Sequence, residues 1–109
     1  MTWLLRDGDV LAAAEVASTP ALRAKGLLGR QGFDGAMVFP RTRSVHTFGM
    51  RFGIDVAFCD KEMVVIDVTT MRTWRLGLPR WHARSLIEAE AGAFERWGLR
   101  VGDHLELRL

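Results

Sequence analysis

Short apolar runs recur along the whole 109-residue chain, and each is closed within a few residues by glycine, proline or a polar turn. Such runs are typical of strands, because a strand buries one face with a few alternating side chains, whereas a helix needs a longer amphipathic stretch. Only two short segments have helical signals, and we expect a parallel sheet to need long crossover helices. We therefore predict a mainly β fold, an antiparallel β-sandwich or partly closed barrel of about seven short strands with two short helices.

The turns divide the apolar runs into hairpins and single strands. Asp7-Gly8 suits the tight turn of an opening hairpin, although the alanine-rich second arm, residues 10–17, also suits a helix. Pro40 cannot donate to a central ladder and is expected to stop a strand ahead of an arginine-bearing loop. The predicted strand segments are the hairpin at 2–17, the strand at 36–40, the segment at 44–50, the hairpin at 53–69, the strand at 85–92 and the turn and strand at 100–109.

Helix signals occur at two places. Ser18 or Thr19 can cap the free N–H groups of a first helix, and Pro20 suits its first turn. We expect Gly29 to end this helix by taking the left-handed conformation. A shorter helix is expected in "GAFERWG", residues 92–98.

Length and composition limit the kind of protein. A chain of this size, with 49% apolar residues, suits a single domain over residues 1–109. Charged residues interrupt the N-terminal stretch, and no apolar window is as long as a membrane span, so we predict a soluble, unexported, cytoplasmic protein without a membrane partner. Cys59 is the only cysteine, which excludes an internal disulfide and fits a reducing compartment. We predict no cofactor.

The distribution of charged residues along the chain is more informative than the net charge. The net charge of +2 gives no indication of nucleic-acid binding. Residues 35–54 and 68–87, however, each contain arginines and no carboxylate. Arginine can simply supply solubility here, and that interpretation stays open beside a binding surface. The arginines in these windows are Arg41, Arg43, Arg51, Arg72, Arg75, Arg80 and Arg84.

The stretch "TMRTWRLGLPRWHARS" places Trp74 and Trp81 among four of these arginines. Such a mixture binds anions or stacks on planar groups. It also suits a loop that packs its tryptophans inward and leaves its guanidinium groups in water, an interpretation that we favour. The candidate binding surface comprises Arg41, Arg43, Arg72, Trp74, Arg75, Arg80, Trp81 and Arg84.

A second candidate lies in "HTFGMRFGIDVAF", where four polar side chains, His46, Thr47, Arg51 and Asp55, interrupt an apolar segment. A carboxylate at the start of the most apolar strand is costly unless it accepts hydrogen bonds. We expect Asp55 to accept them from His46, Thr47, Arg51 or nearby backbone amides. The cluster is then either a structural fastener or part of a ligand pocket.

Other reactive side chains carry weaker signals. The three histidines are far apart in sequence and predict no metal site. Cys59 is expected to be a small apolar residue at a strand end rather than a nucleophile. Glu88 and Glu90 share one face of a strand and resemble a carboxylate pair, but the alternation with Ile87 and Ala89 predicts that both glutamates are solvated.

Four segments cover nearly the whole chain, namely "TPALRAKGLLGR", "GAMVFP", "HTFGMRFGIDVAF" and "LIEAEAGAFERWGLRVGDHLEL". Together they resemble the motifs of an uncharacterised prokaryotic family, domain of unknown function 192. The resemblance implies a compact β-rich sandwich with short helices, and no established activity comes with it. Asp55, Arg23, Arg30 and Gly102-Asp103 match family positions, whereas Gly49 and Phe52 stand where the family commonly has Trp and Asn.

Three functions remain open at this point. The first is a small noncatalytic binding or accessory domain, whose basic, tryptophan-bearing surface takes an anionic or planar ligand or an acidic partner protein. The second is a hydrolase that uses His46 and Asp55 with a bound water, which requires His46 to lie within hydrogen-bond reach of Asp55. The third is a structural subunit, for which a large apolar patch and a dimer in solution would be the signs.

Overall fold

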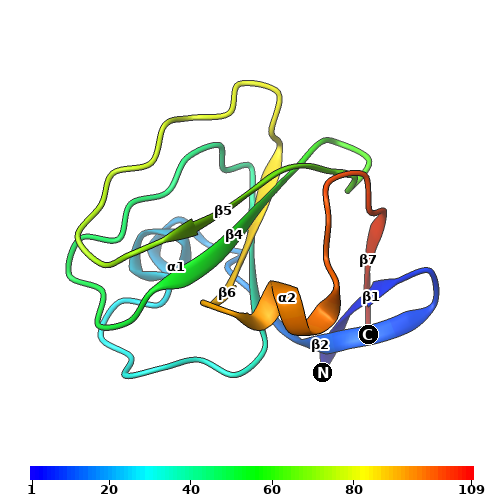
Figure 1. The fold of residues 1–109 in the computed structure, drawn as a ribbon, viewed down its shortest axis with the longest axis horizontal. Coiled ribbons are helices and arrows are strands. Elements are labelled where there is room, and N and C mark those ends of the chain that lie inside the picture. Colours follow the sequence, from blue (N-terminus) through cyan, green and yellow to red (C-terminus); the bar gives the residue numbers. More distant parts are fainter.

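The computed structural model describes residues 1–109 and contains seven strands and two short helices (Figure 1). The predicted class, a mainly β fold with two short helices, is confirmed. Residues 44–50 are the exception among the predicted strand segments, since they contribute only one bridge, between His46 and Leu76. In chain order the elements are β1 (Thr2–Arg6), β2 (Asp9–Val16), α1 (Pro20–Lys25), β3 (Ala36–Pro40), β4 (Ile54–Cys59), β5 (Val65–Met71), β6 (Ser85–Glu90), α2 (Ala93–Trp97) and β7 (Leu105–Arg108).

The strands form one sheet in the order β5-β4-β6-β3-β2-β1-β7, and this sheet curls (Figure 1). Its two edges meet at one end, where the N–H of Val65 donates to the carbonyl of Asp103 and the N–H of Leu105 donates to the carbonyl of Met63, each at 2.9 Å. Because the outer strands join only there, the sheet is a partly closed barrel rather than a sandwich of two separate sheets.

One strand pair departs from the antiparallel pattern. β2 and β3 are parallel, with Ala14 opposite Ala36 and Val16 opposite Val38. The connection between them contains α1 with loops on both sides, and it is long enough for a crossover, which takes a dozen or more residues. The expectation that a parallel pair needs a long helix was therefore wrong at this point of the sheet.

The sequence signals locate α1 and β2 correctly, except for the residue at which α1 ends. The hydroxyl of Thr19 accepts the N–H of Leu22 at 3.1 Å and caps α1, as predicted. The helix ends at Gly26, with φ +49, rather than at Gly29. A Cβ on Gly26 would lie 3.1 Å from the Phe39 ring, so glycine permits both the backbone turn and this close approach. The arm at 10–17 belongs to a strand, β2, and not to a helix.

Two apolar clusters cover opposite faces of β3, β4 and β6. One lies against α2 and includes Val38, Ala57 and Ile87. The other lies beneath α1 and the long loops, and it includes Phe39 and Leu86. The three central strands are therefore buried on both faces, whereas many antiparallel sheets expose one face to solvent.

Burial on both faces changes the interpretation of Glu88. It lies opposite Met37 of β3 and Val56 of β4, and only 6% of it is exposed. The prediction that Glu88 is solvated was wrong, because α1 and the segment after β3 cover the face that alternation had assigned to water. Glu90, at the end of the same strand, is exposed as predicted.

Candidate functional site

Asp55 caps a helix from a neighbouring strand. It is 4% exposed on β4, and one carboxylate oxygen accepts the N–H groups of Gly92 and Phe94 at 3.0 and 3.1 Å. These are the N-cap residue and an early residue of α2, which has no side-chain cap of its own. The other oxygen accepts the Thr70 hydroxyl at 2.7 Å. Backbone amides are thus the only partners of Asp55 that the sequence analysis named, since His46, Thr47 and Arg51 do not bind it.

Thr47 attaches the long loop to the body instead. Its side chain is fully buried, donates to the carbonyl of Arg72 at 2.6 Å and accepts the N–H of Arg75 at 2.8 Å. The backbone of Thr47 accepts the N–H of Trp74 and donates to the carbonyl of Arg75, each at 2.8 Å. A single buried threonine therefore sets the conformation of the first turn of the loop, residues 72–75.

The remaining members of the predicted polar cluster are exposed and separate from Asp55. His46 stacks on Phe48 at 5.3 Å between ring centroids, and its Nδ1 accepts the N–H of Phe48 at 3.3 Å. Arg51 is exposed. The hydrolase alternative requires a contact between His46 and Asp55, and Asp55 is occupied by Thr70 and the α2 amides instead.

Three arginines of the candidate surface line one open groove. Arg72, Arg75 and Arg80 lie along a hollow of about 720 Å³ between β5 and the loop that follows it, and no carboxylate lines it. Arg80 pairs with Asp67 at 2.7 Å and lies 4.3 Å from the centre of the Phe58 ring. Arg72 and Arg75 have no carboxylate partner, so neither charge is neutralised, although Nη1 of Arg75 donates to the carbonyls of Thr73 and Trp74 at 3.3 and 3.4 Å.

The other three arginines of the surface lie around a second hollow. Arg41, Arg43 and Arg84 line it together with Ala83. Two of them are held by carbonyl groups: Arg43 donates to Ala83 at 3.2 Å, and Arg84 donates to Ala83 at 3.1 Å. The six arginines of the predicted surface thus line two hollows, and the N–H of Arg80 from the first set donates to the carbonyl of Arg43 from the second at 2.9 Å.

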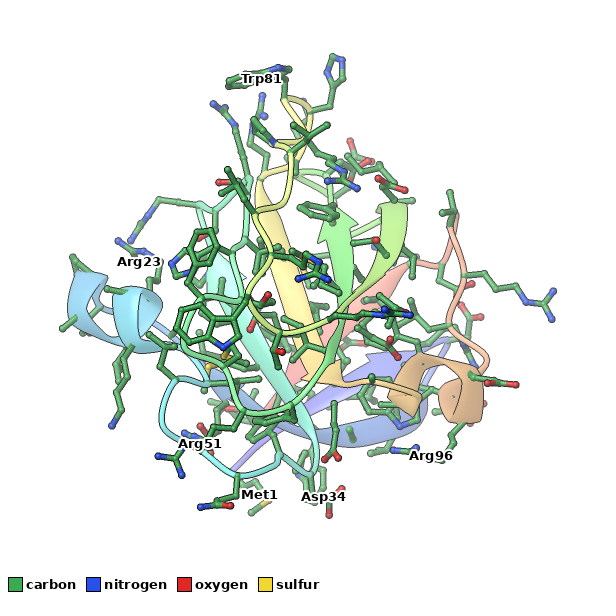
Figure 2. All side chains as sticks on the ribbon, turned by 60° about the vertical axis from the view of Figure 1, so that its left-hand side comes forward. Met1, Arg23, Asp34, Arg51, Trp81 and Arg96 are labelled. Carbon is green, nitrogen blue, oxygen red and sulfur yellow. The ribbon has the colours of Figure 1, made fainter.

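The two tryptophans of the long loop are in solvent. Trp74 is 63% exposed and Trp81 is 71% exposed, and Trp81 lies at the outer tip of the loop, away from Arg51 and Arg96 (Figure 2). The favoured interpretation, in which these rings pack inward, was wrong. Thr47 and Val45 hold the loop through its backbone carbonyls and amides, so the loop does not need its rings as anchors.

Cys59 lies in the apolar interior of the protein. Cys59 is fully buried, and burial, with a smaller effect from Asp60, raises the pKa of its thiol to about 12. The prediction of a small apolar residue at a strand end is confirmed. No three of the His, Cys, Asp and Glu side chains lie together as metal ligands.

Neither helix is long and apolar enough to cross a membrane.

Comparison with known proteins agrees with this architecture. The sequence profile of domain of unknown function 192, described as an uncharacterised ACR, matches residues 3–107. The chain belongs to this family. A UPF0127 protein of Pyrococcus abyssi is 41% identical over 97 residues, which cover 84% of this chain and 83% of that protein. A UPF0127 protein of Thermococcus sibiricus is 32% identical over 98 residues, covering 84% of this chain and 64% of that protein.

Two crystal structures have the same fold as this family member. A protein of unknown function from Novosphingobium aromaticivorans matches with a TM-score of 0.80 and 21% identity, over 96% of this chain and 82% of that one. A protein from Sinorhizobium meliloti, described as a candidate transcription regulator, matches with a TM-score of 0.80 and 20% identity, over 96% and 90%. At these identities the likeness shows the fold alone.

In this member of the family, sequence reasoning missed two sets of groups. Backbone amides were expected as partners of Asp55, but Thr70 was not, nor that the amides belong to α2; these groups are distant in sequence, and the register of β4 with β5 and β6 brings them together. Glu88 was assigned to solvent because alternation cannot show what covers a face. The residues on either side of Glu88 in the sequence do not show that its carboxylate is buried.

Proposed function

We propose that this chain is a small noncatalytic cytoplasmic binding domain that takes an anionic ligand in the groove between β5 and the long loop. The groove lined by Arg72, Arg75 and Arg80 carries the proposal. Its size falls in the range of about 300–1,000 Å³ that is common for ligand pockets. Guanidinium groups form strong, paired hydrogen bonds with carboxylates and phosphates, and the absence of lining carboxylates leaves the local charge positive.

The rigidity of the groove supports the same function. Arg80 is fixed by Asp67 and by the Phe58 ring, and the first turn of the loop is fixed by Thr47. A ligand therefore meets arginines on a prearranged wall, which reduces the entropy lost on binding. Trp74 is exposed in the same turn, but its ring lies 6.4 Å from the Phe48 ring and does not line the groove.

The test is a titration of the full chain with three anions, inorganic pyrophosphate, citrate and an acidic peptide, followed by tryptophan fluorescence and calorimetry. We expect saturable binding of at least one small anion. The double variant Arg72→Ala/Arg75→Ala should weaken it at least tenfold, because one charge-assisted hydrogen bond contributes about 1.5–3 kcal/mol. Preference for the acidic peptide over both small anions would indicate a partner protein instead.

A matched control separates a site from general charge. Arg96→Ala/Arg100→Ala removes the same charge from exposed positions that lie outside the groove. This control should leave the affinity within about twofold of the parent. Equal losses in the two double variants, or no saturable binding of any probe, would refute the groove as a binding site.

A structural subunit is the second candidate, because the same loop exposes large apolar side chains. Leu76 and Leu78 are 73% and 77% exposed, next to the exposed rings of Trp74 and Trp81. Apolar groups clustered on one loop favour contact with another protein surface. A dimer in sedimentation equilibrium that dissociates on Leu76→Ser/Leu78→Ser would support this function, and a monomer at high concentration would count against it.

A further inference from the structure

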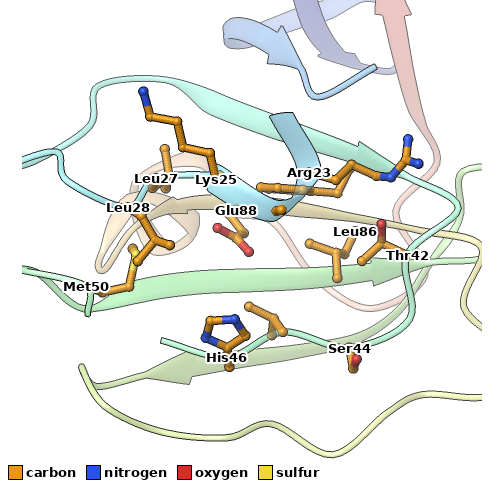
Figure 3. A pocket seen from close by; sticks show the side chains of 14 residues that line it. Arg23, Lys25, Leu27, Leu28, Thr42, Ser44, His46, Met50, Leu86 and Glu88 are labelled. Carbon is orange, nitrogen blue, oxygen red and sulfur yellow. The ribbon is translucent and has the colours of Figure 1, made fainter. Parts of the chain in front are cut away.

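A small cavity lies between α1 and the sheet, and it shares no lining residue with the groove between β5 and the long loop (Figure 3). Its volume of about 80 Å³ is the space of about two or three water molecules. Leu27, Phe39 and Leu86 are among its apolar walls, and the exposed residues Ser44 and His46 line the side that reaches the surface. The cavity is therefore a small hollow with apolar walls that opens to solvent at one side.

Glu88 is the one acidic residue that lines this cavity. It is 6% exposed, and Figure 3 shows its carboxylate in the middle of the cavity, between α1 and His46. No hydrogen bond or ion pair joins the carboxylate to another residue, and burial alone raises its pKa to about 7. Buried charges need donors, so the ionised carboxylate requires a group inside the cavity that the protein itself does not supply.

The two cationic side chains of α1 that line the cavity do not neutralise Glu88. Figure 3 shows the guanidinium of Arg23 on the far side of Thr42, away from the carboxylate. The ammonium group of Lys25 points outward from α1 (Figure 3). Neither side chain forms an ion pair with Glu88, so the negative charge in the cavity is uncompensated.

The other segments around Glu88 add no compensating charge either. Its neighbours in the sheet are apolar, Met37 on β3 and Val56 on β4. His46 is the remaining titratable residue of the lining, and its Nδ1 is occupied because it accepts the N–H of Phe48 at 3.3 Å. A ligand in the cavity therefore meets one carboxylate and a wall of carbon atoms.

This combination favours a cation that has an apolar part. A divalent metal ion takes six or more oxygen ligands, and the lining contains a single carboxylate. A primary ammonium group can instead donate a charge-assisted hydrogen bond to one carboxylate while its carbon atoms contact the apolar walls. The volume limits the part inside the cavity to about two or three non-hydrogen atoms, and the opening at Ser44 and His46 leaves room for a longer substituent.

We propose that this cavity is a binding site for a primary alkylammonium group, whose nitrogen donates to the Glu88 carboxylate and whose first carbon atoms lie against Leu27, Phe39 and Leu86. The site lies apart from the groove between β5 and the long loop and takes a ligand of opposite charge. Neither proposal depends on the other, and binding of an anion in the groove tests only the groove.

The experiment titrates the full chain at pH 8 with ethylammonium and three comparison probes, and follows the methyl resonances of Leu27 and Met50 by NMR. Ethylammonium should give saturable shifts and bind at least tenfold more tightly than ethanol, which lacks the charge, and than potassium, which lacks the carbon atoms. Tetramethylammonium should leave these resonances unchanged, because it is too large for the cavity and has no N–H to donate.

A further probe, Nα-acetyl-lysinamide, separates two sources of the same group. It carries the primary ammonium at the end of a side chain. Tighter binding of this probe than of ethylammonium would support the site with a lysine of a partner protein as its occupant, whereas tighter binding of ethylammonium would support the site with a free amine.

A matched pair of variants tests the role of the carboxylate. Glu88→Gln should weaken the binding of ethylammonium at least tenfold. Glu95→Gln makes the same chemical change at an exposed position outside the cavity, and it should bind ethylammonium like the parent.

The pH dependence of binding gives a second readout. The pKa of Glu88 is about 7, so its ionised fraction, and with it the affinity for ethylammonium, should rise about tenfold from pH 6 to 8. Arginine and lysine stay charged over this interval, so Arg23 and Lys25 do not contribute to the change. Histidines can titrate near neutral pH, and His46→Gln should therefore keep the dependence whereas Glu88→Gln should lose it.

Three outcomes would overturn the proposal. The first is that neither ammonium probe shifts the cavity resonances. The second is that ethanol, potassium or tetramethylammonium binds as tightly as ethylammonium, and the third is that Glu88→Gln and Glu95→Gln behave alike.

Discussion

Replacing Glu88 by glutamine tests the energetic consequence of burying its carboxylate. The side chain is 6% exposed on β6, and burial raises its pKa from 4.5 to about 7. Glutamine keeps nearly the same shape and removes the charge. The substitution therefore isolates the desolvation of one ionised group, which no hydrogen bond or cation of the protein compensates.

The sign and size of the effect follow from the two pKa values. Between pH 4.5 and about 7 the folded protein holds a proton on Glu88 that the unfolded chain has lost, so stability falls as the pH rises through this interval. At 1.36 kcal/mol for each pH unit, the loss reaches about 3 kcal/mol above pH 7. Below pH 4.5 both states are protonated and the loss disappears. Glu88→Gln lacks this dependence.

Urea unfolding of the parent and of Glu88→Gln across this pH range measures the effect. Between pH 4.5 and 8, the free energy of unfolding of Glu88→Gln should rise relative to that of the parent by about 3 kcal/mol. This corresponds to a relative rise of more than about 10 °C in melting temperature. Exposed Glu95→Gln should show no such change. Parallel pH profiles for the parent and Glu88→Gln would refute the reasoning, because they would mean that water or a cation already compensates the charge.

Three further predictions concern the groups that hold the fold together. Asp55→Asn should lower the free energy of unfolding by about 2 kcal/mol and the melting temperature by several degrees, because the α2 amides lose a charged acceptor; unchanged stability in thermal unfolding would argue against the helix cap. Thr47→Val should cost about 1–2 kcal/mol and speed hydrogen exchange at the N–H of Arg75, and equal exchange rates in the two proteins would contradict the role of Thr47 in fixing the loop. Cys59 should resist a thiol reagent in the folded protein and react after denaturation, since a thiol with a pKa of about 12 is protonated at neutral pH; rapid labelling of the native state would show that the strand end opens.

The local signals of the sequence were sufficient for most elements of the fold. Alternating apolar residues between turns identified the hairpins, and Thr19 with Pro20 located the start of α1. These features depend on a few consecutive residues, because backbone conformation and capping are local properties. The number of strands and the need of Asp55 for hydrogen-bond donors could therefore be anticipated, whereas its bond with Thr70 and its place at the start of α2 could not.

Only the tertiary structure decided which faces of the sheet are exposed to solvent and which side chains are in contact. Alternation shows that Glu88 and Leu86 share a face, but only the crossover after β2 places α1 over that face and buries the carboxylate. The exposure of Trp74 likewise depends on a distant threonine that holds the loop by its backbone. Burial is set by elements remote in the chain, and residue order within one strand carries no information about what lies above it.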